Sequence, residues 1–249
     1  MELLPVVVCA LLGAIIASFV GVLAERVHTG QSWARSRSRC NSCARILSPL
    51  DLVPVLSWLS TIGRCRTCGA RIPAAYLFLE LVLGGLFAYS YVSLGPTLAL
   101  LVFLASLSVL AFVVVYDLRH TIVPPYASLL LALLALTFMA LTTPTLHEAG
   151  SALLVAGGIG GAFLLLHVFS QGRAMGLGDA PIAFSLALLT APHAFAGLLF
   201  SFWIGALCGI VILGMRRGGP TMGIEVPFVP FMAAGFLLAY FTGWNPLLF

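Results

Sequence analysis

The sequence predicts an all-α polytopic membrane protein with about eight transmembrane helices and one small cytoplasmic insertion that carries four cysteines in a zinc-like pattern. Three observations predict it. The 249-residue chain is 61% hydrophobic and only 8% charged, with a mean hydropathy of +1.12. Apolar runs recur along it, and a helix needs about 20 apolar residues to cross the hydrocarbon core of a bilayer. The charged residues gather in a few short segments between those runs.

Eight candidate spans follow from the apolar runs. The sixth is short and the break around residues 191–193 is weak, so a count of seven stays open. The first span is expected to be a membrane helix rather than a cleavable signal peptide, because no basic segment precedes it and its apolar run is too long. No convincing internal repeat is visible. The spans are residues 3–24, 73–92, 96–116, 123–142, 149–170, 180–191, 194–214 and 227–244.

This reading divides the chain into three parts. Residues 1–24 form the first transmembrane helix, and residues 25–72 form the cytoplasmic insertion with its four cysteines. Residues 73–249 form a transmembrane bundle that carries the candidate active site.

Arginine sets the predicted orientation, since the chain contains no lysine. With eight spans, the connections alternate between two sides, and one side receives all twelve arginines. The positive-inside rule makes this side cytoplasmic and places the N-terminus outside. The net charge of +4 is therefore a topology signal rather than a sign of nucleic-acid binding, and the basic loops can also contact anionic lipid headgroups. The arginines are Arg26, Arg35, Arg37, Arg39, Arg45, Arg64, Arg66, Arg71, Arg119, Arg173, Arg216 and Arg217.

The cysteines of the insertion form two CxxC pairs. Cys40 and Cys43 make the first, Cys65 and Cys68 the second, with 21 residues between them. Two such pairs separated by about 15–20 residues indicate a tetrahedral four-cysteine zinc site, and this spacing lies just outside that window. Nearby arginines favour thiolates, and the reducing cytoplasm disfavours a disulfide. Structural zinc is the favoured interpretation, while reactive cysteines or cysteines without a metal remain alternatives.

Two aspartates fall at the cytoplasmic ends of spans. Asp117 closes the third span in VVVYDLRHTIVPP, and Asp179 opens the sixth in MGLGDAPI. A single ionisable residue at a membrane boundary is commonly only an interfacial anchor. Two of them at one predicted depth, each in an unusual local sequence, indicate a functional pair.

Such a pair has a specific chemistry. Two carboxylates within a few ångströms cannot both ionise easily, so they share a proton. The ionised group can then remove a proton from water while the protonated group polarises a peptide carbonyl. Gly176 and Gly178 would let a substrate backbone approach and let the chain bend into Asp179. The alternative is that these glycines only permit close helix packing.

Five motifs in order resemble the type IV prepilin leader peptidases, the bacterial branch of the GxGD membrane aspartyl proteases. The chain departs from the family pattern at Gly21, where relatives have Asn, and at Pro181, where they have Lys. The motifs are ASFVGVLAERV at 17–27, the CxxC…CxxC insertion with DLVPVLSWL between its pairs and Glu80 after it, DLRHTIVPP at 117–125, MGLGD at 175–179 and PFVPFMAAG at 227–235.

The resemblance implies a membrane aspartyl endopeptidase with Asp117 and Asp179 as its catalytic pair. Such enzymes cut the basic leader from type IV prepilins, or from type II secretion pseudopilins, at the cytoplasmic face of the bacterial inner membrane. Many also N-methylate the new N-terminus with S-adenosylmethionine, an activity linked to the insertion. Nothing in this sequence independently indicates a methyl-donor site. The expected partners are these substrates and the lipid bilayer, without nucleic acid.

Two other classes remain as alternatives. A proton-coupled or cation transporter could use paired membrane aspartates, although it would more naturally place them near mid-bilayer and needs no four-cysteine insertion. A non-catalytic membrane scaffold could use the zinc-like insertion to bind a partner.

Overall fold

The computed structural model describes residues 3–32, 37–215 and 226–246. Within these ranges the only regular elements are helices, accompanied by two isolated β-bridges and no strand. The all-α prediction is confirmed. The chain forms two compact units, Met1–Val115 and Tyr116–Phe249. Three arginines used in the sequence arguments, Arg35, Arg216 and Arg217, lie outside the described residues.

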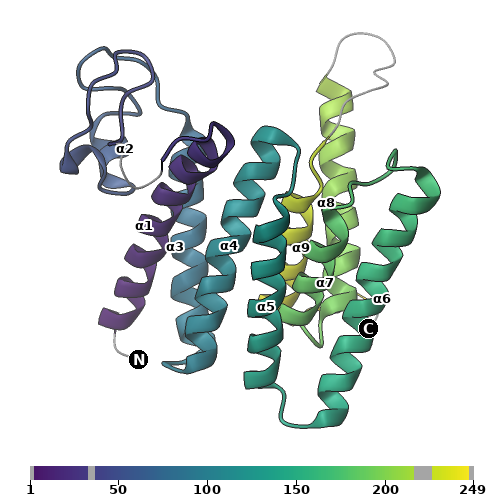
Figure 1. Cartoon of the computed structure of the whole chain (residues 1–249). Coiled ribbons are helices and arrows are strands. Elements are labelled where there is room, and N and C mark those ends of the chain that lie inside the picture. The colour runs from purple at the N-terminus through teal and green to yellow at the C-terminus, as the bar shows by residue number, and fades with distance from the viewer. Residues whose placement is uncertain (1–2, 33–36, 216–225, 247–249) are drawn as a thin grey trace. The chain divides into compact units, whose positions relative to one another are not determined.

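Each predicted span has a helix at its position (Figure 1). The insertion adds a single 3₁₀ turn and one short helix. In chain order the elements are α1 (Leu3–His28), η1 (Pro49–Asp51), α2 (Leu56–Ser60), α3 (Ala74–Leu94), α4 (Leu98–His120), α5 (Pro125–Thr142), α6 (Leu146–Ser170), α7 (Asp179–Leu189), α8 (Ala194–Met215) and α9 (Val229–Thr242).

Six of these helices, α1, α3, α4, α5, α6 and α8, are long and apolar enough to cross a membrane. The helices α7 and α9 are apolar but have only 11 and 14 residues. At about 1.5 Å per residue, an 11-residue helix covers about 16 Å of a hydrocarbon core about 30 Å thick. The predicted count of eight spans is therefore not confirmed, although all eight apolar segments are helical.

In the first unit, α1 and α3 pack closely along their length. A Cβ atom added at Gly13 would lie 2.6 Å from the Leu83 carbonyl oxygen, and one at Gly84 would lie 2.9 Å from the Ala10 carbonyl oxygen. Small residues allow such close approach of helix backbones in membranes. The insertion lies at one end of this helix pair (Figure 1).

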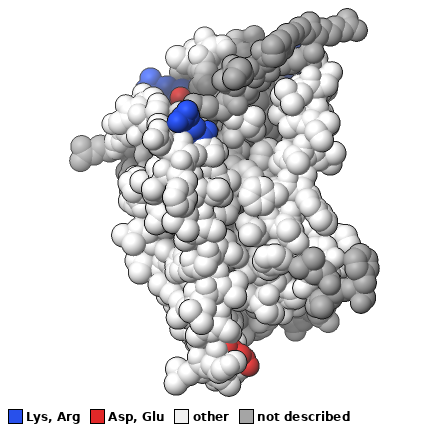
Figure 2. All heavy atoms as spheres, turned by 90° about the vertical axis from the view of Figure 1, so that its right-hand side faces the viewer, with Lys and Arg blue, Asp and Glu red and all other residues white. Residues whose placement is uncertain are grey.

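In the second unit, α7 is the central helix. Nine of its eleven residues are buried, and it contacts α5, α6, α8 and α9. The surrounding helices expose apolar side chains instead, with Leu154, Leu207 and Ile210 each more than 60% exposed. Figure 2 views the side on which α6 and α8 lie and shows a surface almost free of charged side chains among the described residues. Such a surface suits contact with lipid rather than water.

Candidate functional site

Asp117 lies in the last turn of α4 and is only 5% exposed. The backbone N–H of Val229 donates a hydrogen bond to its carboxylate. Val229 is the first residue of α9, and the first N–H groups of a helix have no partner within that helix. The start of α9 therefore supplies a backbone donor to this carboxylate. Its Oδ2 atom is buried and has no hydrogen-bond partner among the described residues.

Asp179 is the first residue of α7 and is 9% exposed. Its Oδ2 accepts a hydrogen bond from the Gly176 N–H at 3.1 Å, and its own N–H donates to the Gly176 carbonyl at 3.3 Å. These two bonds close the GLGD segment into a turn. The turn fixes the carboxylate at the start of a helix in which nine of eleven residues are buried.

The structure brings the two predicted aspartates together. Asp117 and Asp179 lie close enough for their charges to interact, although they come from different helices and are 62 positions apart in the sequence. Both are buried within the second unit. Two carboxylates in such a place can share one proton, which suits one of them to act as a base and the other as an acid.

The two glycines of the turn have different surroundings. A Cβ atom added at Gly178 would lie 2.6 Å from the Cβ of Val123, so the space there is already filled by the segment between α4 and α5. A Cβ atom at Gly176 would meet only Asp179 Oδ2, at 3.5 Å. Close packing therefore accounts for Gly178, while the backbone at Gly176 is open beside the carboxylate.

We expect Gly178→Ala to lower both the melting temperature and the activity of the site, because the added methyl group would overlap Val123. Overpacking of this kind costs about 1–3 kcal/mol. Thermal unfolding and the rate of substrate cleavage measure the effect. The double variant Gly178→Ala/Val123→Gly removes the clashing Cβ and should recover stability. A fully stable and active Gly178→Ala variant would contradict this packing.

Sequence reasoning did not find His167, a residue near the end of α6 that holds the GLGD turn from the other side. Its Nδ1 lies 2.9 Å from the Met175 carbonyl oxygen. Because a carbonyl can only accept, Nδ1 must carry the proton. This carbonyl belongs to the same peptide group whose N–H, on Gly176, donates to Asp179. His167 and Asp179 thus hold one peptide group from both ends.

His167 is therefore predicted to position the turn without taking part in the chemistry. His167→Leu should lower kcat several-fold, since this part-buried hydrogen bond contributes about 0.5–1.5 kcal/mol and about 1.4 kcal/mol is a factor of ten. His167→Asn should keep most of the rate, because its amide can donate from the position of Nδ1. His167→Gln, whose amide reaches further, is the matched comparison and should stay impaired. Equal rates for the Asn and Leu variants would remove this role.

The four cysteines of the insertion lie together, with all four Sγ atoms within 4.8 Å of one another. Each CxxC pair sits in a tight turn, called a knuckle below, and the two knuckles have the same hydrogen-bond pattern. The N–H of Cys40 donates to the Arg45 carbonyl and the N–H of Cys65 to the Ala70 carbonyl, each at 2.9 Å. The two knuckles repeat this pattern at an offset of 25 residues, a short local repeat that the sequence analysis missed although RCxxC occurs in both.

The geometry of this cluster fits a zinc ion. Cys40 Sγ and Cys68 Sγ are 3.8 Å apart, far beyond a disulfide bond of about 2.05 Å. Zinc–sulfur bonds of about 2.3 Å in a tetrahedron place sulfur atoms about 3.8 Å apart. Backbone N–H groups of Cys68 and Thr67 lower the pKa of Cys65 to about 6, while burial and the neighbouring thiols raise the pKa of Cys68 to about 11, so Cys65 is the thiol that most readily becomes a thiolate. The backbone of the turn therefore lowers the pKa of Cys65, whereas the sequence had suggested that nearby arginines would do so.

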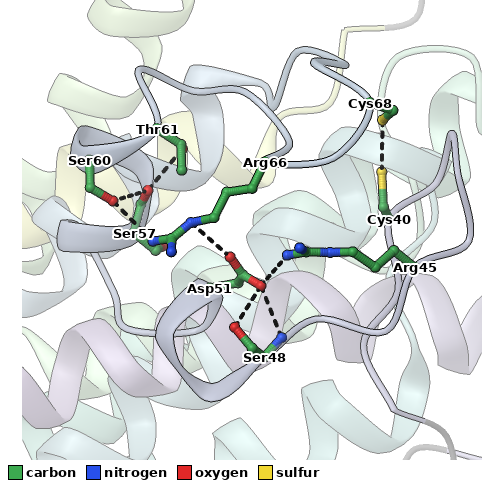
Figure 3. A network of polar contacts seen from close by, with 9 residues as sticks. All are labelled: Cys40, Arg45, Ser48, Asp51, Ser57, Ser60, Thr61, Arg66 and Cys68. Atoms are coloured by element: carbon green, nitrogen blue, oxygen red, sulfur yellow. Dashed lines mark hydrogen bonds and ion pairs between the residues drawn. The ribbon is translucent and has the colours of Figure 1, made fainter.

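A carboxylate network ties the linker between the knuckles to both of them (Figure 3). Asp51 pairs with Arg45 of the first knuckle and, at 3.2 Å, with Arg66 of the second. The Ser48 N–H donates to Asp51 at 2.9 Å, and this bond together with the Ser48 hydroxyl and the two arginines lowers the pKa of Asp51. A part-buried, ionised Asp51 therefore joins the knuckles independently of the thiols.

The family-pattern departures have local explanations. A Cβ atom at Gly21 would lie 3.1 Å from the ring of Tyr76, so this ring occupies the space a larger side chain would need. Pro181 lies in the first turn of α7. Backbone N–H groups of a first turn make no hydrogen bond within the helix, so a proline is tolerated there.

Two family descriptions match the chain. Residues 11–94 match the bacterial Peptidase A24 N-terminal domain, and residues 102–214 match the type IV leader peptidase family. The first range contains the cysteine cluster, and the second contains both aspartates.

Curated proteins similar to this chain carry the name prepilin leader peptidase/N-methyltransferase. One from Bacillus subtilis is 33% identical over 93% of this chain and 92% of its own length. One from Myxococcus xanthus is 34% identical over 84% of this chain, which spans 64% of that protein. One from Dichelobacter nodosus is 29% identical over 83% of this chain and 71% of its own length. No solved structure matches the chain significantly.

Proposed function

The chain belongs to the type IV leader peptidase family, and from this premise we propose that it is an aspartic endopeptidase that cleaves the basic leader from type IV prepilins or type II secretion pseudopilins. The observation that carries the proposal is the pairing of Asp117 with Asp179 in one buried site. In the proposed reaction, the ionised member of the pair removes a proton from a water molecule. The protonated member donates a hydrogen bond to the scissile carbonyl.

The surrounding backbone supports these roles. The Val229 N–H donates a hydrogen bond to the Asp117 carboxylate. The Oδ2 atom of this carboxylate has no partner among the described residues and is available for water or substrate. The Gly176 N–H holds Asp179 Oδ2, and the open backbone at Gly176 offers room for an extended substrate segment. The chain thus supplies a fixed acid–base pair with a place beside it for a peptide.

The proposed substrate also needs an apolar contact, because a prepilin keeps a hydrophobic helix in the bilayer next to its leader. A groove of about 460 Å³ with an apolar lining reaches Leu118, although Asp117 itself does not line it. Leu118, the residue after Asp117, lines it together with Pro227 and Pro230 from either side of Val229. We assign the first apolar residues after the cleaved bond to this groove.

The proposed membrane face follows from charge. The arginine partition of the eight-span topology supports a position for the ends of α4 and α6, and with them Asp117 and the GLGD turn, on the cytoplasmic side of the bacterial inner membrane. A prepilin leader is basic and stays in the cytoplasm, so its junction with the apolar helix would lie at this level.

For the cysteine cluster we propose a structural zinc ion held by Cys40, Cys43, Cys65 and Cys68. Bound zinc would cross-link the two knuckles and so fold the insertion. The cluster belongs to the first unit and the aspartates to the second, so zinc has no assigned part in the cleavage chemistry.

The names of the relatives extend the proposal to methyl transfer from S-adenosylmethionine to the new N-terminus. A cavity of about 730 Å³ in the first unit has the size of a ligand site. Its lining does not fit the positively charged sulfonium of S-adenosylmethionine, however. Seven arginines line the cavity against three carboxylates, and each of these carboxylates already has a partner within the protein. The proposed methylation therefore rests on family membership alone.

A cleavage assay with purified, reconstituted protein tests the proposal. The substrate carries a short basic leader, a Gly at the junction and an apolar helix. A smaller product that is absent when the junction Gly is replaced supports an endopeptidase. An intact substrate, together with proton or cation flux across the same vesicles, would instead support a transporter. An intact substrate without flux would support a scaffold.

A further inference from the structure

The cavity of the first unit has an unusual charge. Its walls come from the insertion, the end of α1 and the start of α3. They carry four more arginines than carboxylates. The arginines are Arg26, Arg37, Arg39, Arg45, Arg64, Arg66 and Arg71, and the carboxylates are Glu25, Asp51 and Glu80.

Most of this positive charge is not neutralised within the protein. Asp51 pairs with Arg45 and Arg66, and Glu80 accepts a hydrogen bond from the Val55 N–H at 2.7 Å. The Nε atom of Arg45 is buried and has no acceptor among the described residues. Four further arginines of the lining form no ion pair with a described carboxylate: Arg37, Arg39, Arg64 and Arg71. The cavity therefore presents donors and positive charge to an anionic ligand.

The cavity lies at the end of α1 and the start of α3, where a membrane surface is expected. Both α1 and α3 are long and apolar enough to span, and the lining includes Gly21 near the end of α1 and Tyr76 in the first turn of α3. The bond between Val55 and Glu80 holds the linker against the second turn of α3. The linker therefore lies along the side of α3 at this point and does not extend past the end of the helix.

The insertion also exposes large apolar side chains. Leu50, Leu56 and Ile62 are 67%, 64% and 80% exposed. Exposed apolar side chains next to a basic site are the pattern of a segment lying in the interface of an anionic bilayer, with its apolar side chains at the acyl boundary. Basic pockets beside membrane helices on the cytoplasmic side bind anionic lipid headgroups.

We propose that this cavity binds the phosphate headgroup of an anionic phospholipid, with the exposed side chains of the 46–62 linker resting on its acyl chains. The four arginines without carboxylate partners, Arg37, Arg39, Arg64 and Arg71, contact the phosphate. Bound lipid would thereby hold the insertion on the membrane surface. This inference does not depend on the proposed peptidase activity.

Native mass spectrometry of the purified full-length protein tests it, with phosphatidylglycerol and phosphatidylcholine of identical acyl chains as probes. Wild-type protein should retain phosphatidylglycerol preferentially. An arginine near an anionic surface contributes about fivefold in affinity, so Arg71→Gln should weaken retention about fivefold and Arg37→Gln/Arg71→Gln about 25-fold. Arg173→Gln, which removes the same charge from the second unit, should leave it unchanged. Unchanged zinc content and thermal unfolding verify that the variants are folded.

Soluble glycerol phosphate separates lipid from free phosphate as the ligand. It should not displace phosphatidylglycerol at equal concentration, because it lacks the acyl chains that contact the linker. Ile62→Ser should weaken retention of the lipid. Equal retention of the two lipids, equal losses for Arg71→Gln and Arg173→Gln, or displacement by glycerol phosphate at equal concentration would each overturn the proposal.

Discussion

Asp179→Asn is expected to abolish leader cleavage while the protein still accumulates in the membrane at its normal level. Asparagine keeps the size of the side chain and can still accept from the Gly176 N–H, so the turn should fold. It cannot take up a proton as a base or share one with Asp117. Losing a general acid or base costs about 10²–10⁴-fold in rate. Asp117→Asn should have an effect of the same size, because the pair acts as one unit.

Glu148→Gln provides the matched control. This carboxylate is exposed in the first turn of α6, away from the GLGD turn that follows the end of the same helix. Its neutralisation removes the same charge and should leave cleavage unchanged. Cleavage at the wild-type rate by either aspartate variant would refute the assignment of the pair. A loss of the protein from the membrane would show instead that the aspartate is needed for folding.

Cys65→Ser is expected to release zinc and unfold the insertion. Cys65 is the buried member of the cluster, and structural zinc contributes about 10–16 kcal/mol to the folding of small zinc domains. The network around Asp51 is too small to replace it, because ion pairs at a partly exposed site contribute only about 0–1 kcal/mol each. Elemental analysis should find one zinc ion per wild-type chain and none in the variant.

Limited proteolysis within residues 37–72 reports the folding of the insertion. The variant, and wild-type protein treated with a strong chelator, should both be cut there much faster than untreated wild type. Cys9→Ser removes a thiol from α1 outside the cluster and should change neither measurement. Wild-type protein that contains no metal, yet resists proteolysis, would contradict the zinc proposal.

The helices were predictable because composition alone determines them in a membrane protein. The run predicted at 149–170 became Leu146–Ser170, and the one at 96–116 became Leu98–His120. The number of spans was less accessible. A short helix surrounded by protein and one exposed to lipid have the same apolar composition, so the sequence could not reveal that α7 is packed on all sides.

The two aspartates of the candidate site were predictable from the sequence, but the groups that hold them in position were not. Two carboxylates in an apolar chain are conspicuous, and their motifs placed them at the same level. The Val229 N–H leaves no trace in a side-chain pattern, because every residue except proline has such a donor. His167 in an apolar helix could equally have been a packing residue, and only its contact with Met175 identifies its role.

The central claim is that this chain is a peptidase that uses Asp117 and Asp179, and the intact mass of a prepilin-type substrate tests it most directly. The substrate is incubated in vesicles with wild-type protein, or with the double variant Asp117→Asn/Asp179→Asn. We expect wild-type protein to split the substrate into the free leader and one product shorter by that leader, and the double variant to leave the substrate mass unchanged. An unchanged mass with folded wild-type protein, or the same product from the double variant, would contradict the claim.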